Sequence, residues 1–134
     1  MNKCRVFYEC WQMECCGEAF SIGDNVKWLV HENGDLNTPV DLGEIDYCYE
    51  AHSSDWRRLL VLEGKVEEIK ILYERYMPTP NDDRLLVPVS GEVIGAERAK
   101  GFDRKVRGME AAGYVVLLSG YTVRAAQKEE VTFK

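Results

Sequence analysis

Residues 20–30, FSIGDNVKWLV, restrict the fold more than any other segment, because a turn leads there directly into an alternating apolar pattern. The Gly-Asp pair in this segment is typical of a tight turn. Val26, Trp28 and Val30 follow the turn at a spacing of two residues. Successive side chains of a strand point to opposite faces, so this spacing predicts a strand that buries one face.

Four further segments have the composition of β-strands. Residues 3–13 are rich in β-branched and aromatic side chains. Residues 114–125 start with the most apolar run of the chain and then alternate. Residues 85–94 contain Pro88, which lacks a backbone N–H and therefore indicates an edge strand. Residues 45–49 alternate over a short stretch and predict another edge strand.

Residues 56–76 fit two kinds of secondary structure. Their apolar side chains recur every three or four residues, which favours a helix. Gly64 lies in the middle of that helix and would cost about 1 kcal/mol relative to alanine. A strand fits if the pattern slips by one residue near residues 67–68, as a β-bulge produces. Because a bulged strand lets a small barrel turn a corner, we favour the strand.

A hairpin tip and one helix complete the expected fold. Residues 77–83 contain two prolines and a polar cluster, and they predict the tip of a hairpin. Residues 96–112 predict one short helix, because Phe102, Val106 and Met109 share a helical face and a glycine follows as a stop signal. A chain of 134 residues is the length of one domain. We therefore expect a single, mainly β domain over residues 1–134, a small barrel with one short helix.

Two pieces of the sequence resemble the small SH3-like or Tudor-like barrels. These pieces are Phe20-x-x-Gly23-Asp24-x-Val26-x-Trp28 and Gly64-x-Val66-x-x-Ile69. The resemblance places them in the first two barrel strands, with a glycine in the tight turn and with the valine and tryptophan facing the core. It implies an SH3-like or related β-barrel.

A longer resemblance covers most of the chain. The string Trp11-Gln-Met-x-Cys15-Cys16-Gly17-x-x-Phe20-x-x-Gly23-Asp24 resembles the signature of a family of uncharacterised bacterial proteins. Later pieces resemble the same family: Tyr49-Glu50-Ala51-His52, Gly64-x-Val66-x-x-Ile69 and Gly113-Tyr114-x-Val116. This resemblance implies a bacterial origin and a domain of unknown function.

The charge balance and the N-terminal segment restrict partners and location. Seventeen basic and twenty-three acidic side chains give a net charge of −6. Nucleic acids and anionic membranes attract basic surfaces, so this balance argues against both as partners. The first residues lack the apolar core of a signal peptide, and no apolar run is long enough to span a membrane. We therefore expect a cytoplasmic protein, in which the five cysteines remain reduced thiols.

The strongest candidate for chemistry is a zinc site built from four cysteines and a histidine: Cys10, Cys15, Cys16, Cys48 and His52. Zinc takes four tetrahedral sulfur or nitrogen ligands, often from two closely spaced pairs. Cys10 with Cys15 and Cys48 with His52 provide two such pairs at looser spacing, and Cys16 is a substitute for Cys15. The alternative is that these cysteines are small hydrophobic residues of the core.

A thiol-dependent enzyme is a further alternative, with a cysteine activated by His31 or His52. A nucleophilic cysteine needs a lowered pKa. Glu14 and Glu18 flank the adjacent cysteine pair, and their charges would raise thiol pKa values instead. No G-x-S-x-G, H-E-x-x-H or similar catalytic motif occurs in the sequence. These observations favour a protein that is not an enzyme.

Aromatic side chains in excess of what the strand patterns need suggest a binding surface: Tyr47, Tyr49, Trp56 and Tyr76. Tyrosine and tryptophan are the usual anchors of protein interfaces. The alternative is that these residues belong to the core and rim of a small barrel. The favoured function is a non-enzymatic interaction module that binds a protein partner or forms a homodimer.

Overall fold

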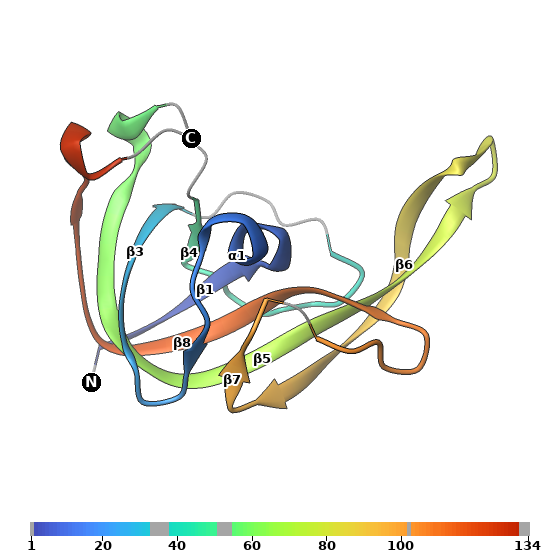
Figure 1. Ribbon diagram of the computed structural model, residues 1–134, viewed down its shortest axis with the longest axis horizontal. Helices are drawn as coiled ribbons and strands as arrows, with labels where there is room; N and C mark the ends of the chain where they lie inside the picture. The colour runs from blue at the N-terminus through green and yellow to red at the C-terminus, as the bar shows by residue number, and fades with distance from the viewer. Residues whose placement is uncertain (1, 33–37, 51–54, 102, 132–134) are drawn as a thin grey trace.

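The computed structural model describes residues 2–32, 38–50, 55–101 and 103–131, and Figure 1 shows its arrangement. The principal sheet contains six strands: β1 (Lys3–Glu9), β3 (Asn25–Glu32), β4 (Tyr47–Tyr49), β5 (Leu60–Thr79), β6 (Asp82–Ala96) and β8 (Glu110–Ala125). A small second sheet pairs β2 (Phe20–Ser21) with β7 (Arg98–Ala99). The described residues contain a single α-helix, α1 (Cys10–Cys16), and two 3₁₀ turns, η1 (Trp56–Arg58) and η2 (Lys128–Glu130).

Five of the six strands close into a ring. The order is β3-β4-β1-β8-β5, and β5 pairs back onto β3. The pairing of β1 with β4 is parallel, whereas the other pairings in the ring are antiparallel. This ring confirms the expected mainly β, barrel-like fold with one short helix. The finer SH3-like assignment stays a prediction.

Strand β5 joins the two parts of the molecule. Its first residues pair with β3, its last residues pair with β6, and it pairs with β8 over most of its length. The β5–β8 register shifts between Val66 and Glu68, which confirms both the strand and the bulge expected near residues 67–68. Gly64 is needed where strands approach closely, because a Cβ there would lie 3.2 Å from the Cβ atoms of Leu118 and Tyr121.

The core of the ring contains a cluster of aromatic side chains. The Tyr8 ring stacks on Tyr49, with ring centroids 3.8 Å apart. Trp28 packs edge-on against Tyr8 at 5.4 Å and against Phe20 at 5.0 Å. Trp28 and Val30 are buried, so the half-buried strand expected after the Gly-Asp turn is confirmed. Aromatic pairs of this geometry stabilise a core beyond their simple burial.

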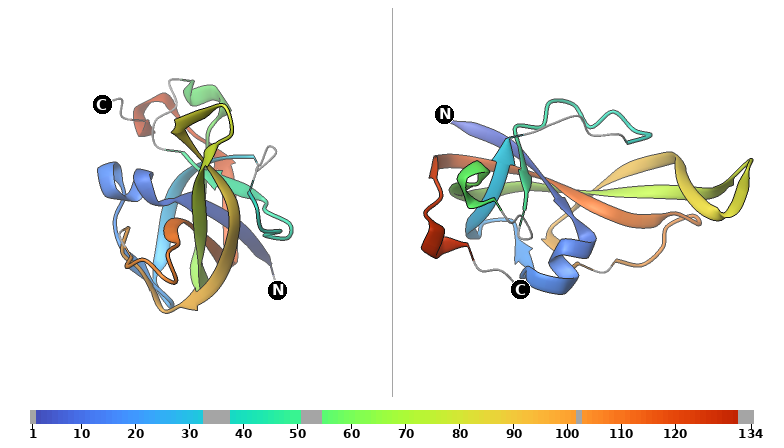
Figure 2. Two further views of the ribbon diagram at one scale, coloured as in Figure 1. Left: turned by 90° about the vertical axis from the view of Figure 1, so that its right-hand side faces the viewer. Right: turned by 90° about the horizontal axis from the view of Figure 1, so that it is seen from above.

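Strands β5 and β6 extend past the ring as a two-stranded hairpin, which we call the arm (Arg75–Ser90). Strand β8 begins at Glu110, opposite Glu74, so the residues of β5 after Glu74 pair only with β6. Figure 2 shows this hairpin projecting from the body of the molecule. The tip lies at residues 80–81, which confirms the expected hairpin but makes its turn shorter than the predicted loop. Strand β6 is at the end of the sheet, as Pro88 indicates.

The helix expected over residues 96–112 is wrong. Residues 98–99 form β7, and a tight hairpin joins Val106 to Met109 through two backbone hydrogen bonds of 3.0 and 2.8 Å. Arg107 and Gly108 between them have φ angles of 49° and 77°, which a right-handed helix excludes and a type I′ turn requires. The three-residue spacing of Val106 and Met109 therefore reflects cross-strand pairing. Phe102, part of the same prediction, lies outside the described residues.

Two strand predictions also need correction. The strand expected over residues 3–13 ends at Glu9, and α1 begins at Cys10. The edge strand expected at residues 45–49 is β4, which lies between β1 and β3 inside the ring, with partners on both sides. Local alternation identified this strand but could not place it in the sheet. Within the described residues, no helix has the length and apolar character needed to cross a membrane.

Candidate functional site

The structure describes the side chains of two cysteines of the expected zinc site, and each belongs to a different apolar cluster. Cys10 is buried in the main core with Tyr8 and Met13. Cys48 is buried in a second cluster with Phe7 and Leu72. No group of three histidine, cysteine or acidic side chains able to hold a metal ion occurs among the described residues. The side chains of Cys15 and Cys16, and all of His52, lie outside this description, so the zinc site stays a prediction.

Two of the buried thiols are poor nucleophiles. Burial, followed by the nearby Asp46 carboxylate, raises the pKa of Cys4 to about 12. Burial, followed by Glu9 and Glu50, raises the pKa of Cys48 to about 11. A nucleophilic cysteine needs a pKa that is lowered from its usual value. These two cysteines therefore have the environment of structural core residues.

The four aromatic residues expected to form a binding surface lie in different places. Tyr47 is half-buried against Tyr121, with ring centroids 6.4 Å apart, and Tyr49 belongs to the aromatic core. Trp56 packs against a small apolar cluster beneath η1. Tyr76 is at the base of the arm and lines a cleft between the arm, α1 and the loop before β8. Of the four, Tyr76 is the residue that the structure places at a candidate site.

This cleft has a volume of about 640 Å³ and lies between the base of the arm, the start of α1 and the loop before β8. It opens where β1 ends. Glu9 is the last residue of β1 and pairs with Gly113, whereas β8 begins three residues earlier, at Glu110. Residues 110–112 therefore have β5 on one side and the cleft on the other. The volume is within the usual range for ligand pockets.

The lining of the cleft combines acidic and aromatic side chains. Among the described residues that line it, the carboxylates belong to Glu9, Glu74, Asp103 and Glu110, and the ammonium group belongs to Lys105. Lys105 is already paired with Glu110, with Nζ and Oε1 3.2 Å apart. Each remaining carboxylate accepts a hydrogen bond from a neutral aromatic donor. The donors are Trp11 to Glu9 (2.8 Å), Tyr76 to Glu74 (3.1 Å) and Tyr114 to Asp103 (2.6 Å).

Glu74 is the unusual member of this set, because only 7% of it is exposed. Its Oε1 accepts the Tyr76 hydroxyl, while its Oε2 is buried and has no hydrogen-bond partner in the described structure. Burial raises the pKa of Glu74, and the Tyr76 hydrogen bond opposes that shift. Burial and then the Glu74 charge raise the pKa of Tyr76 to about 12. A buried carboxylate with an unpartnered oxygen is costly to maintain.

We expect Glu74→Gln to stabilise the protein at about pH 8 by roughly 1–2 kcal/mol, because the amide keeps the shape of the side chain but removes a buried charge, which costs more to bury than a neutral polar group. The native pKa is raised, so the native state binds the proton more tightly than the unfolded chain. Stability from this group is therefore present below the unfolded pKa and is lost as pH rises through the native pKa. Glutamine does not titrate, so its advantage should disappear well below pH 4.5, the ordinary value.

Urea unfolding of both forms at the two pH values measures this difference. The control is Glu110→Gln, an exposed carboxylate of the same cleft, which should change stability by no more than about 0.5 kcal/mol. If Glu74→Gln has the same free energy of unfolding as the parent protein at high pH, burial of the Glu74 charge does not destabilise the native state.

The sequence contained a signal for Glu74 that local strand patterning overlooked. Glu74 lies between Leu72 and Tyr76 at a spacing of two, so it is an acidic residue between two large apolar or aromatic side chains on one strand face. Such a residue is a marker of a functional site. Asp103 gave no comparable signal, because the loop that contains it was expected to be helical. Its place beside Tyr114 depends on the fold of that loop.

The closed ring, the projecting arm and the acidic cleft at its base define a small, mainly β protein with one short α-helix. Residues 2–120 match DUF6578, a family of unknown function, and the chain belongs to this family. Comparison with curated proteins and with solved structures gave no match. The arm and the cleft both lie within the matched residues.

Proposed function

We propose that this protein is a non-enzymatic binding module that contacts a partner protein through its arm. The observation that carries this proposal is the exposure of large apolar side chains on the hairpin. Met77, Leu85, Leu86 and Val89 are between 48% and 57% exposed. Clustered apolar side chains on a projecting element are characteristic of protein interaction sites.

The exposed side chains are on both faces of the arm. Met77 pairs across the hairpin with Val87, and the neighbouring residue Pro78 pairs with Leu86. Because adjacent residues of a strand point to opposite faces, these two pairs lie on opposite sides of the ribbon. The arm would bury the apolar side chains of both faces if it inserted into a groove of a partner protein. A two-stranded hairpin has little stability of its own, so contacts of this kind would also stabilise it.

We expect side chains, and not the backbone edge, to make the contact. The β5–β6 register shifts between Arg75 and Tyr76, which leaves Val89 as the extra residue of β6 beside Pro88. A proline and a bulge both interrupt the row of hydrogen-bonding groups along an edge strand. These features disfavour simple addition of another strand and leave the apolar side chains as the recognition element.

A cytoplasmic location is part of this proposal. Cys4, Cys10 and Cys48 are buried in the described structure. The cysteines of a cytosolic protein are kept as reduced thiols. The absence of a membrane-spanning helix among the described residues is compatible with the same location.

Site-specific photo-crosslinking in cells of the natural host tests the proposal. A photoreactive residue at Leu86 should give one distinct adduct with another protein. The matched control is the same residue at Val123, an apolar side chain that is 40% exposed on β8, outside the arm. Replacing Met77 and Leu85 by serine should remove the Leu86 adduct without unfolding the protein, because both side chains are exposed.

The mass of the adduct distinguishes the two kinds of partner. An adduct with another protein supports the proposal, whereas an adduct of two copies of this chain replaces it with a homodimer formed by the arm. Equal labelling from Leu86 and Val123, or no adduct from Leu86, would show that the arm is not a binding surface.

A further inference from the structure

The cleft at the base of the arm has more negative charge than its surroundings neutralise. Glu9, Glu74 and Asp103 line it and form no ion pair with a basic side chain in the described structure. Their hydrogen bonds from tryptophan and tyrosine orient the carboxylates but add no positive charge. A concave surface of one sign focuses its electrostatic potential and attracts ions of the opposite sign.

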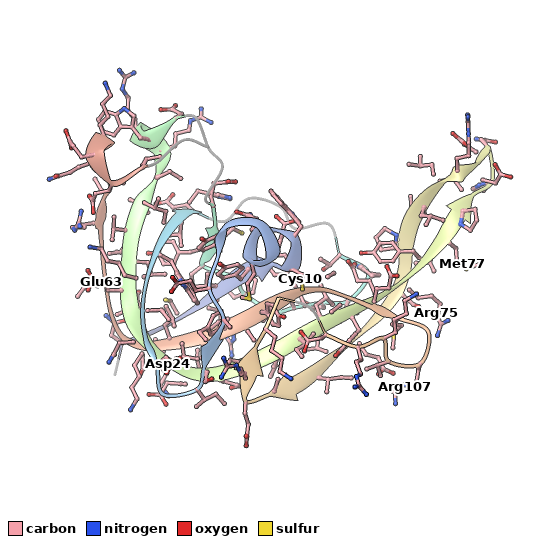
Figure 3. All side chains as sticks on the ribbon, viewed as in Figure 1. Cys10, Asp24, Glu63, Arg75, Met77 and Arg107 are labelled. Atoms are coloured by element: carbon pink, nitrogen blue, oxygen red, sulfur yellow. The ribbon has the colours of Figure 1, made fainter. Side chains whose placement is uncertain are left out.

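Three basic side chains around the cleft have other partners. Arg75 follows Glu74 on β5 and donates from Nη2 to the Arg107 carbonyl oxygen, 2.7 Å away. Arg107 forms an ion pair with Glu92 of β6, and Lys105 is paired with Glu110. Figure 3 shows Arg75 and Arg107 at the base of the arm, with Cys10 at the start of α1. The negative charge of the cleft is therefore available to a ligand.

Glu74 is a second, independent feature of the cleft that points to a cationic ligand. It is more than nine-tenths buried, it lines the cleft, and its Oε2 has no hydrogen-bond donor. Leu72, the preceding residue of β5 on the same face, is apolar and buried, so Glu74 continues a buried position with a carboxylate. A positive charge in the cleft would favour the ionised carboxylate and lower the cost of keeping it buried.

The other walls of the cleft suit an organic cation. Trp11 is exposed over half its surface, and its indole N–H is held by Glu9. Tyr76 and Phe7 provide further aromatic surface in the same cleft. Aromatic faces attract ammonium and guanidinium groups through their quadrupole, and the attraction grows when the cation loses water. An alkyl chain attached to the cation would also bury apolar surface against these rings.

A single metal ion does not fit the same residues. No three acidic, cysteine or histidine side chains among the described residues are placed to coordinate one ion. The carboxylates are instead distributed around a space of about 640 Å³. A ligand that reaches several of them must be extended and must itself donate hydrogen bonds.

We propose that this cleft binds an organic cation, in which an ammonium or guanidinium group on an alkyl chain is held by Glu74 and Asp103 and covered by Trp11 and Tyr76. The cation is either a basic side chain of a peptide or a free amine, because both present the same group to the cleft. The proposal does not depend on the apolar surface of the arm. Each can fail while the other holds.

Calorimetric titration with defined probes tests the proposal. The peptides acetyl-Gly-Lys-Gly-amide and acetyl-Gly-Arg-Gly-amide represent a basic side chain, and spermidine represents a free amine. Acetyl-Gly-Glu-Gly-amide is the matched probe of opposite charge. We expect saturable binding of at least one cationic probe, no binding of the acidic peptide, and weaker binding as salt is raised. The preference between the peptides and spermidine identifies the source of the cation.

Two conservative variants identify the site. Glu74→Gln and Asp103→Asn keep the size of each side chain and an acceptor oxygen, and each should weaken binding about tenfold, the loss expected for a charge-assisted contact. Glu74→Gln is expected to be more stable than the parent protein, so its loss of binding cannot be caused by unfolding. The matched control is Glu92→Gln, whose carboxylate is paired with Arg107 outside the cleft and should leave affinity unchanged.

Three results of these titrations would contradict the proposal. Failure of all three cationic probes to bind at millimolar concentration would overturn it. Unchanged affinity in both Glu74→Gln and Asp103→Asn would place any binding elsewhere on this acidic protein. Loss of binding in the Glu92→Gln control to the same extent would indicate a general effect of net charge, which also overturns the proposed site.

Discussion

Replacing Leu62 by alanine is expected to destabilise the protein by about 3 kcal/mol, within the range for large-to-small substitutions in a core. Leu62 is 0% exposed and lies on β5 between two strands of the ring. It pairs with Trp28 of β3 on one side and with Val123 of β8 on the other. The substitution removes apolar contacts where the ring closes and leaves a cavity that its paired neighbours cannot easily fill.

Urea unfolding followed by tryptophan fluorescence measures the loss, since Trp28 is beside the substituted residue. Leu86→Ala is the matched control, because it makes the same chemical change at a leucine that is 57% exposed on the arm. It should change stability by no more than about 0.5 kcal/mol. Similar effects at the two positions would mean that β5 does not close the ring against β3.

Replacing Gly17 by alanine is expected to cost about 1–3 kcal/mol, as overpacking of a filled interior does. Gly17 ends α1, and its N–H donates to the carbonyl oxygens of Gln12 and Met13. Its φ of −96° is open to any residue, so torsion does not require glycine here. A methyl group would instead overlap the Tyr8 hydroxyl oxygen and lie 2.9 Å from the Met13 Cα.

A double-mutant cycle with Tyr8→Phe tests this cause. Phenylalanine lacks the hydroxyl oxygen, so Gly17→Ala should cost less in the Tyr8→Phe protein, with a coupling energy of about 0.5 kcal/mol or more. Gly23→Ala is the control for a glycine required by torsion, because Gly23 has a φ of 95° and open space around it. Its cost should be the same in both backgrounds. A Gly17→Ala cost that is also unchanged would exclude the contact with Tyr8.

The close contact with Tyr8 explains why a glycine follows the two cysteines at residues 15–16. The glycine allows the end of α1 to approach Tyr8, whose ring stacks on Tyr49 in the core. In the sequence this glycine was only one position of the string that resembles a family signature. Its distance from Tyr8 is set by the helix between them, which the alternating pattern of residues 3–13 did not reveal.

Sequence patterns located most strands correctly where apolar alternation was clear. The half-buried strand after residue 24, the bulged strand over much of residues 56–76, and the edge strand containing Pro88 are all present. The bulge was predictable because a change of phase in a period-two pattern has a direct structural meaning. The helix was misplaced because Val106 and Met109 are spaced equally well for a helical face and for a tight hairpin.

The candidate sites were less predictable than the strands. The four aromatic residues were chosen for their chemical type, and the structure distributes them between the core, the rim and the cleft. The acidic cleft was not foreseen at all. It combines residue 9 at the end of β1, residue 74 on β5 and residue 103 in the loop before β8. No local pattern links three positions so far apart in the chain.

The sequence by itself determined that this protein is mainly β, which residues of its clearest strand face the core, and where its long hairpin turns. These properties follow from the alternation of side chains along one strand, which neighbouring residues encode. Only the tertiary structure decided that β3 closes onto β5, that α1 follows β1, and that buried Glu74 meets an open cleft. These features depend on contacts between distant segments, whose partners are selected by packing of the whole chain.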